Sequence, residues 1–179
     1  MSNYLDSEDS DEESPEIVCT LSEEEVAAIR EQCAEIKAEA NAAFAAKDYE
    51  VAVEKYSNIL NLLKTSNLPP DDVILCNRSA SYLALKRYVP ASHDALQASK
   101  VNPDNWKSHW RQGVAIMHMA QRKFRTKQAV AAFERCAECS TLPENKRAEV
   151  RQAIQGAKAR LADQDANTPM PDMSNCAPS

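Results

Sequence analysis

The sequence predicts an all-α protein in which helices stack in pairs as an α-solenoid. Only 2 of its 179 residues are glycine, which disfavours hairpin-rich β architecture because primed turns use glycine. Apolar residues recur at helical spacing, and small residues recur at intervals of 34 to 39 positions. Hydrophobic residues make up 44% and charged residues 27% of the chain, a composition typical of a globular domain.

Seven helices are expected, and the first begins at a capping box. There the Ser22 hydroxyl bonds a first-turn N–H and the Glu25 side chain reaches back. This helix continues to about residue 47, and Pro69 and Pro70 interrupt the chain after the second. Pro90 suits the first position of the fourth helix. The later helices are expected at 50–64, 72–86, 90–101, 105–120, 127–140 and 143–163.

The two ends of the chain differ in composition from the middle. Residues 1–20 hold seven acids and no Lys or Arg, which predicts an acidic disordered tail. The remaining residues hold 27 − 7 = 20 acids and 21 bases, so the body is nearly neutral and no nucleic-acid partner is expected. Residues 164–179 carry prolines, asparagines and serines, and are expected to be a second disordered tail. Residues 21–163 form the predicted domain.

Composition also excludes several classes of function. With two distant glycines the chain has no Gly-rich loop to cradle phosphates, so no nucleotide cofactor is expected. It has no run of 18 apolar residues that would span a membrane, and its acidic start lacks the apolar region of a secretory signal. We therefore expect a cytoplasmic protein with no cofactor and no membrane contact, whose six cysteines are reduced thiols.

An internal repeat distinguishes a solenoid from a simple helical bundle. The repeating small residues are Ala40, Ser79 and Gly113 in the first helix of each pair, and Ala52, Ala91 and Ala129 in the second. The basic period is 34, with five residues added around 67–71 and four in the turn before Ala129. This is the tetratricopeptide repeat (TPR) pattern. We expect an α-solenoid of three TPR helix pairs (33–66, 72–105 and 106–142) plus a C-terminal capping helix over 143–163.

Five polar residues are expected to line the concave groove of this solenoid, on the first helix of each pair. Lys37 and Asn41 are four positions apart and share a helix face, as do Lys107 and Arg111, and Asn77 lies between them in the stack. The expected groove holds three cations, two amides and no carboxylate. Such a set matches a peptide end with two carboxylates, each of which needs charge-assisted donors already in place.

Three stretches of the sequence resemble the two-carboxylate clamp of TPR co-chaperones. They are Lys37-Ala-Glu-Ala-Asn41, Cys76-Asn77-Arg78-Ser79-Ala80 and Trp106-Lys107-Ser-His-Trp-Arg111. Members of this family bind the C-terminal Glu-Glu-Val-Asp of heat shock protein 90 and heat shock protein 70. Ala40 departs from the family pattern, which usually has glycine at that position.

The resemblance implies a role for each clamp residue. Lys37, Asn41 and Asn77 would hold the terminal main-chain carboxylate of the ligand. Lys107 and Arg111 would hold the side chain of its terminal Asp and nearby peptide groups.

Three further residues complete the expected peptide site. Small Ala80 leaves room for the bound backbone, and Phe44 and Leu83 give its apolar side chain a floor.

Other chemistry-bearing residues are interpreted as structural. Cys136 and Cys139 have C-x-x-C spacing, but no second pair completes a zinc site, so both are expected to be packing cysteines and no metal is expected. His109, Trp106 and Trp110 are also expected to pack. No catalytic constellation is present, which predicts that the protein is not an enzyme.

Ser10 and Ser14 in the acidic tail have the contexts of acid-directed and proline-directed kinase sites. Two alternatives remain open for the tail itself: it competes weakly for the cationic groove, or it only adds solubilising charge.

The sequence thus predicts a monomeric adaptor that binds the C-terminal peptide of heat shock protein 90, heat shock protein 70 or both. The alternatives are a TPR scaffold for another acidic or carboxylate-terminated peptide, and the targeting subunit of a separate enzyme.

Overall fold

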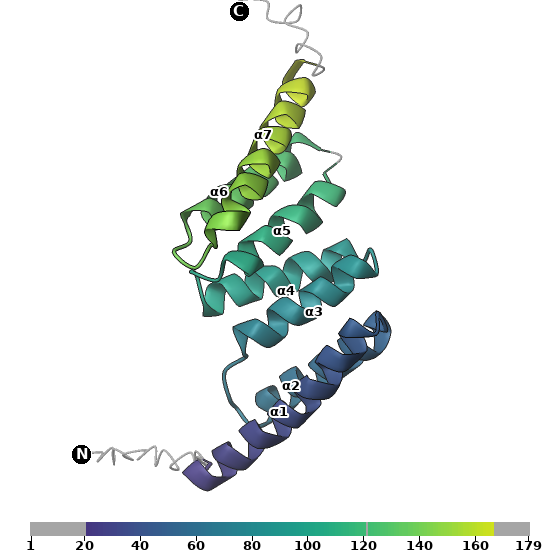
Figure 1. The fold of residues 1–179 in the computed structure, drawn as a ribbon, viewed down its shortest axis with the longest axis vertical. Coiled ribbons are helices and arrows are strands. Elements are labelled where there is room, and N and C mark those ends of the chain that lie inside the picture. The colour runs from purple at the N-terminus through teal and green to yellow at the C-terminus, as the bar shows by residue number, and fades with distance from the viewer. Residues whose placement is uncertain (1–20, 121, 167–179) are drawn as a thin grey trace, which may run out of the picture.

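A computed structural model of the chain describes residues 21–120 and 122–166, and all its regular elements there are helices (Figure 1). The helices are α1 (Glu23–Ala45), α2 (Tyr49–Thr65), α3 (Asp72–Ala84), α4 (Tyr88–Val101), α5 (Trp106–His118), α6 (Lys123–Glu138) and α7 (Glu144–Ala166). They follow one another along an elongated stack, as expected for an α-solenoid. Ser10, Ser14 and most of both expected tails lie outside the described residues.

Local side-chain chemistry sets the helix ends. The Ser22–Glu25 capping box is confirmed, with Ser22 N donating to Glu25 Oε2 at 2.7 Å. Lys47 and Lys86 follow helix ends with φ of 65° and 57°, a left-handed conformation that closes the last turn without glycine. Pro90 is the third residue of α4 rather than the first. It is tolerated there because N–H groups of the first turn have no intrahelical acceptor.

The repeated small residues lie where paired helices cross. Ala40, Ala52, Ala91 and Ala129 are each 0% exposed. Ser79 is equally buried, and its hydroxyl donates to the Ala91 carbonyl across the α3–α4 crossing at 2.8 Å. Each helix pair therefore packs at close range, and the inferred repeat is confirmed as a packing register.

The third helix pair differs from the expected length. Its first and second small residues are 129 − 113 = 16 positions apart, against 12 in the other pairs. The expectation that all four extra residues lengthen the turn is wrong. Helix α6 begins six residues before Ala129, whereas α2 and α4 each begin three residues before their alanine, so most of the insertion extends α6.

A buried ion pair lies within the second helix pair, and a hydrogen bond from its arginine links it to the first pair. Arg78 on α3 forms a fork with Asp94 on α4, with N···O distances of 2.7 and 2.8 Å. Its third nitrogen donates to the Ser57 hydroxyl on α2 at 3.0 Å. Asp94 is 2% exposed, so removing Arg78 would leave a buried carboxylate without the fork that pairs it.

Helix α7 covers the apolar face of α6, as expected for a capping helix. Val150 and Ala157 are buried in this interface, Lys158 pairs with Glu134 at 2.8 Å, and Thr126 donates to Gln164 at 2.7 Å. The helix continues to Ala166, three residues beyond its expected end, because its last turns still contact α6.

The two glycines permit a matched test of this packing. A Cβ at Gly113 would lie 2.5 Å from the Phe133 ring, whereas a Cβ at Gly156 meets no atom within 4 Å. We expect Gly113→Ala to lower the free energy of unfolding by about 1–3 kcal/mol through overpacking. We expect Gly156→Ala to raise it by about 0.5–1 kcal/mol, since alanine is the better helix former. Urea unfolding of both variants measures this, and equal effects would contradict the close α5–α6 crossing.

Candidate peptide-binding site

The hydroxyl group of Tyr56 is the centre of the predicted site. Tyr56 lies on α2 and is 1% exposed, so its hydroxyl needs a partner inside the protein. It donates to the Asn41 side-chain carbonyl on α1 at 2.7 Å. This bond fixes which way the Asn41 amide faces, with its NH₂ group directed away from Tyr56. Sequence reasoning assigned Tyr56 to packing alone and missed the role of its hydroxyl.

Asn77 on α3 and the charge of Arg111 on α5 also act on this hydroxyl. Burial raises the pKa of Tyr56, while a hydrogen-bonding interaction with Asn77 and the positive charge of Arg111 partly oppose that rise. One predicted site residue on each of three helices therefore interacts with Tyr56, Asn41 and Asn77 through hydrogen bonding and Arg111 through its charge. We call Asn41, Tyr56, Asn77 and Arg111 the Tyr56 cluster.

Arg111 has donor capacity that the protein does not use. One of its terminal nitrogens, Nη1, is buried and has no hydrogen-bond partner among the described residues. The neighbouring Cys76 thiol is also buried, and burial raises its pKa, against which the charge and hydrogen bond of Arg111 act. A desolvated guanidinium N–H without an acceptor is costly, and an anionic ligand group would supply the missing acceptor.

Lys107 and Asn77 line a common cleft of about 270 Å³, which we call the Lys107 cleft. The expectation that the groove contains no carboxylate is wrong, because Asp72 lines this cleft too. The Asp72 carboxylate accepts from the Asn105 amide at 2.8 Å and the Asn102 amide at 3.1 Å. Asp72 is the first residue of α3, one turn before Cys76, and so faces the same side of the helix.

The structure places Lys37 in a different hollow, of about 390 Å³, between α1, α2 and the start of α3. Lys37 is half-buried there, and Asp71 lines the same hollow. Thus Asn41, Asn77 and Arg111 converge on Tyr56, Asn77 and Lys107 share the Lys107 cleft, and Lys37 lies beside these groups.

Phe44, Ala80 and Leu83 are half-buried. Phe44 packs against the α1–α2 core and meets the Tyr49 ring edge-on, with centroids 5.3 Å apart. That these three residues contact a ligand stays a prediction.

The remaining chemistry-bearing residues pack in the core. His109 is 5% exposed, and its Nε2 lies 2.8 Å from the Pro103 carbonyl. Trp106 and Trp110 contact the core around Cys136 and Cys139. Cys139 is the residue that ends α6 rather than part of the helix. Among residues 21–120 and 122–166, no three His, Cys, Asp or Glu side chains gather as a metal site.

The buried thiol of Cys136 gives a prediction with a pH signature. Burial raises its pKa from 9.0 to about 12. The neutral thiol is favoured in the folded state, so its contribution to stability is complete below about pH 9 and is lost as the pH rises towards 12. We expect Cys136→Ala to lower the free energy of unfolding by about 1 kcal/mol at pH 7.5. This difference between the variant and the unchanged chain should become smaller by pH 10.5.

Urea unfolding at both pH values measures this, and thermal unfolding with and without a chelator is the control for metal. Stoichiometric zinc in the purified protein, with a lower melting temperature after chelation, would contradict the packing role.

Comparisons with known proteins agree with this architecture, although no family model matches the chain. Heat shock protein STI1 of Saccharomyces cerevisiae is 40% identical over 81 residues, which is 45% of this chain and 13% of that protein. The chain therefore matches only a small part of that relative's length.

No helix among the described residues is both long and apolar enough to cross a bilayer.

Solved TPR domains have the same fold. The Sgt2 TPR domain from Aspergillus fumigatus has a TM-score of 0.61 at 27% identity and covers 82% of this chain and 91% of its own. The first TPR of Spaghetti (RPAP3), solved bound to the HSP90 peptide SRMEEVD, has a TM-score of 0.62 at 20% identity over 74% of this chain and 94% of its own. The described residues therefore have the fold of a tetratricopeptide repeat domain, and part of the sequence is similar to heat shock protein STI1.

Proposed function

We propose that the protein is an adaptor that binds the C-terminal Glu-Glu-Val-Asp peptide of heat shock protein 90 or heat shock protein 70. The Tyr56 cluster and the Lys107 cleft are the binding site. Asn41, Asn77 and Lys37 hold the terminal main-chain carboxylate, and Lys107 and Arg111 hold the carboxylate of the terminal Asp side chain. Phe44, Ala80 and Leu83 accommodate the residues before it.

The buried, unpartnered Nη1 of Arg111 is the observation that carries this proposal. The cost of desolvating this N–H group is already part of the folded state, so a rotation of Arg111 that brings it to an incoming carboxylate gains a charge-assisted hydrogen bond without that cost. The amide groups of Asn41 and Asn77 are held close by through Tyr56. This arrangement favours an anionic ligand with two acceptor groups a few ångströms apart. The peptide seen with the Spaghetti TPR domain has this chemistry.

The adaptor role includes no catalysis and places the protein in the cytoplasm with its chaperone partners. Three of the four described cysteines, Cys76, Cys136 and Cys139, are buried thiols whose pKa values burial raises, which suits packing and disfavours attack on a substrate. A pull-down eluted with free Glu-Glu-Val-Asp peptide separates this role from a scaffold for a separate enzyme. Chaperones leave the resin with the peptide, whereas a scaffolded enzyme stays.

We expect Arg111→Ala to weaken binding of a Glu-Glu-Val-Asp peptide by about 30-fold or more. Loss of one partner from a desolvated charge pair costs about 2–5 kcal/mol, and a micromolar complex has about −8 kcal/mol in total. Isothermal titration calorimetry of the full chain measures the loss. Arg151→Ala, an exposed change on α7, is the matched control and should bind as the unchanged chain does.

Amidating the C-terminus of the peptide should cause a comparable loss with the unchanged protein, because it removes the charge that Lys37 would meet. Undiminished binding of the amidated peptide would show that the site does not read a terminal carboxylate.

Asp72 should oppose the same ligand, because it places a negative charge beside Lys107. Asp72→Asn keeps an acceptor for the Asn102 and Asn105 amides while removing the charge. We expect it to tighten peptide affinity about two- to five-fold at low salt, a gain that fades as salt screens the charge. Asp163→Asn, at an exposed position on α7, is the control. Weaker binding by Asp72→Asn would mean that the carboxylate instead positions the Lys107 cleft.

A further inference from the structure

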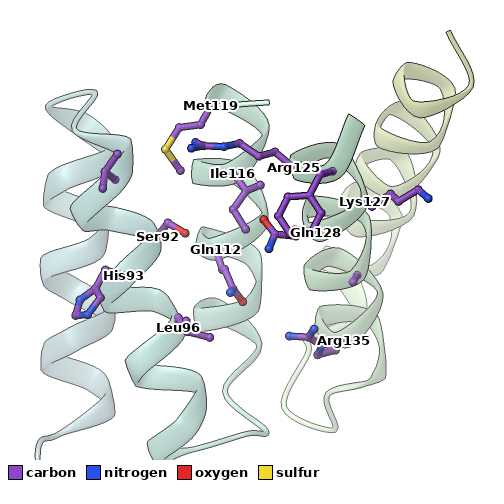
Figure 2. Close-up of a pocket in the computed structure, with 13 residues that line it drawn as sticks. Ser92, His93, Leu96, Gln112, Ile116, Met119, Arg125, Lys127, Gln128 and Arg135 are labelled. Atoms are coloured by element: carbon purple, nitrogen blue, oxygen red, sulfur yellow. The ribbon is translucent and has the colours of Figure 1, made fainter. Parts of the chain in front are cut away.

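A second and larger hollow lies between α4, α5 and α6, away from the Tyr56 cluster. We call it the α4–α6 hollow; its volume is about 780 Å³. Figure 2 shows Gln112 and Ile116 of α5 in its floor, with Arg125 of α6 extending across towards Met119. Val89 and Phe124 on its two rims are each 68% exposed, which is high for large apolar side chains in a folded domain.

The charged side chains that line the α4–α6 hollow are all positive. Arg125, Lys127 and Arg135 line it, and no Asp or Glu does. All three cations are exposed, and none pairs with a carboxylate of the described chain. Most other cations of α6 and α7 with an acid nearby are paired, as in Lys158–Glu134 at 2.8 Å. The Lys107 cleft, in contrast, contains Asp72. The α4–α6 hollow is therefore the better surface for a ligand with many negative charges and no terminal carboxylate.

A buried acceptor in the floor indicates that the ligand includes peptide groups. Gln112 is 8% exposed, and its side-chain carbonyl oxygen has no hydrogen-bond partner among the described residues. A backbone N–H from a docked segment would supply the missing donor. Exposed apolar rims, unpaired cations and an unpaired acceptor together fit an acidic peptide with apolar residues beside its charges.

We propose that the acidic N-terminal segment of this same chain, residues 4–9, docks in the α4–α6 hollow. That segment holds Asp6, Glu8 and Asp9, and Tyr4 and Leu5 precede them. Its charges complement Arg125, Lys127 and Arg135, and its flanking apolar residues complement Val89 and Phe124. This docking is independent of the chaperone-peptide proposal, because it uses different side chains.

Tethering makes a weak contact effective. Residues 10–20 link this segment to the described chain and span up to about 36 Å at roughly 3.3 Å per residue. A flexible tether of this size gives an effective concentration in the millimolar range, so a contact too weak to persist between separate molecules is populated within one. Phosphate on Ser10 or Ser14 would add negative charge and strengthen it.

Photo-crosslinking in the full chain tests the docking. Tyr4 is replaced by the photoreactive aromatic residue p-benzoylphenylalanine, the chain is irradiated at low salt, and crosslinked peptides are identified by mass spectrometry. We expect crosslinks to residues 89–96 or 124–135. Their yield should fall at least about five-fold in an Arg125→Glu/Arg135→Glu double variant and in 0.5 M NaCl, as screening requires.

The matched control is Lys100→Glu/Arg151→Glu. Both of these cations are exposed, lie outside the hollow and have no ion pair with a described residue, so the yield should not change. Circular dichroism verifies that each variant is folded. A mixture of ¹⁴N- and ¹⁵N-labelled chains identifies crosslinks between molecules. Crosslinks to α1, α3 or the first turns of α5, crosslinks mainly between chains, an unchanged yield in the Arg125→Glu/Arg135→Glu variant, or no crosslink would each overturn the proposal.

Discussion

The close approach of paired helices at buried small residues is the constraint on which the rest of the structure depends. Gly113 packs directly under the Phe133 ring, and Ser79 bonds across to the Ala91 carbonyl. These crossings fix both the spacing and the rotation of each pair. Asn77 and Arg111 each lie two positions before the small residue of their helix. The same register therefore turns both side chains to one side, where Asn77 and the charge of Arg111 act on the Tyr56 hydroxyl.

Burial of these polar groups determines how much they gain by contacting a carboxylate. A lysine or arginine in water is already solvated, so it gains little from an exposed carboxylate. Arg111 is different, since one of its nitrogens is buried without an acceptor, and Tyr56 holds the neighbouring Asn41 amide in a fixed orientation. In the proposed site, the fold carries part of the ordering and desolvation costs of binding a ligand. Asp72 limits how cationic the site becomes, which favours a ligand that places its charges at defined points over any acidic polymer.

The sequence contains enough to predict the fold and most of the site's composition. The 34-residue period, the Ser22 capping box and the paired prolines locate the helices to within a few residues, because each acts through local backbone chemistry. Side chains that act across helices are harder to predict. Tyr56 reads as a packing residue, and Asp72 reads as an ordinary first-turn acid, until the stacking brings α2, α3 and α5 together. One available signal was the choice of tyrosine rather than phenylalanine at a fully buried position, since a buried hydroxyl requires a partner. The lengthened start of α6 was not predictable from spacing, because an insertion at a turn and an insertion in a helix give the same interval.

The most direct test of the central claim follows the side chains of the Tyr56 cluster themselves. Nuclear magnetic resonance of the ¹⁵N-labelled full chain resolves the side-chain amides of Asn41 and Asn77 and the guanidinium N–H groups of Arg111 during titration with a Glu-Glu-Val-Asp peptide. The account predicts that these three groups shift together and saturate with one affinity, and that the C-terminally amidated peptide leaves them largely unmoved. Shifts confined to the α4–α6 hollow, or equal responses to both peptides, would contradict a carboxylate-reading site built around Tyr56.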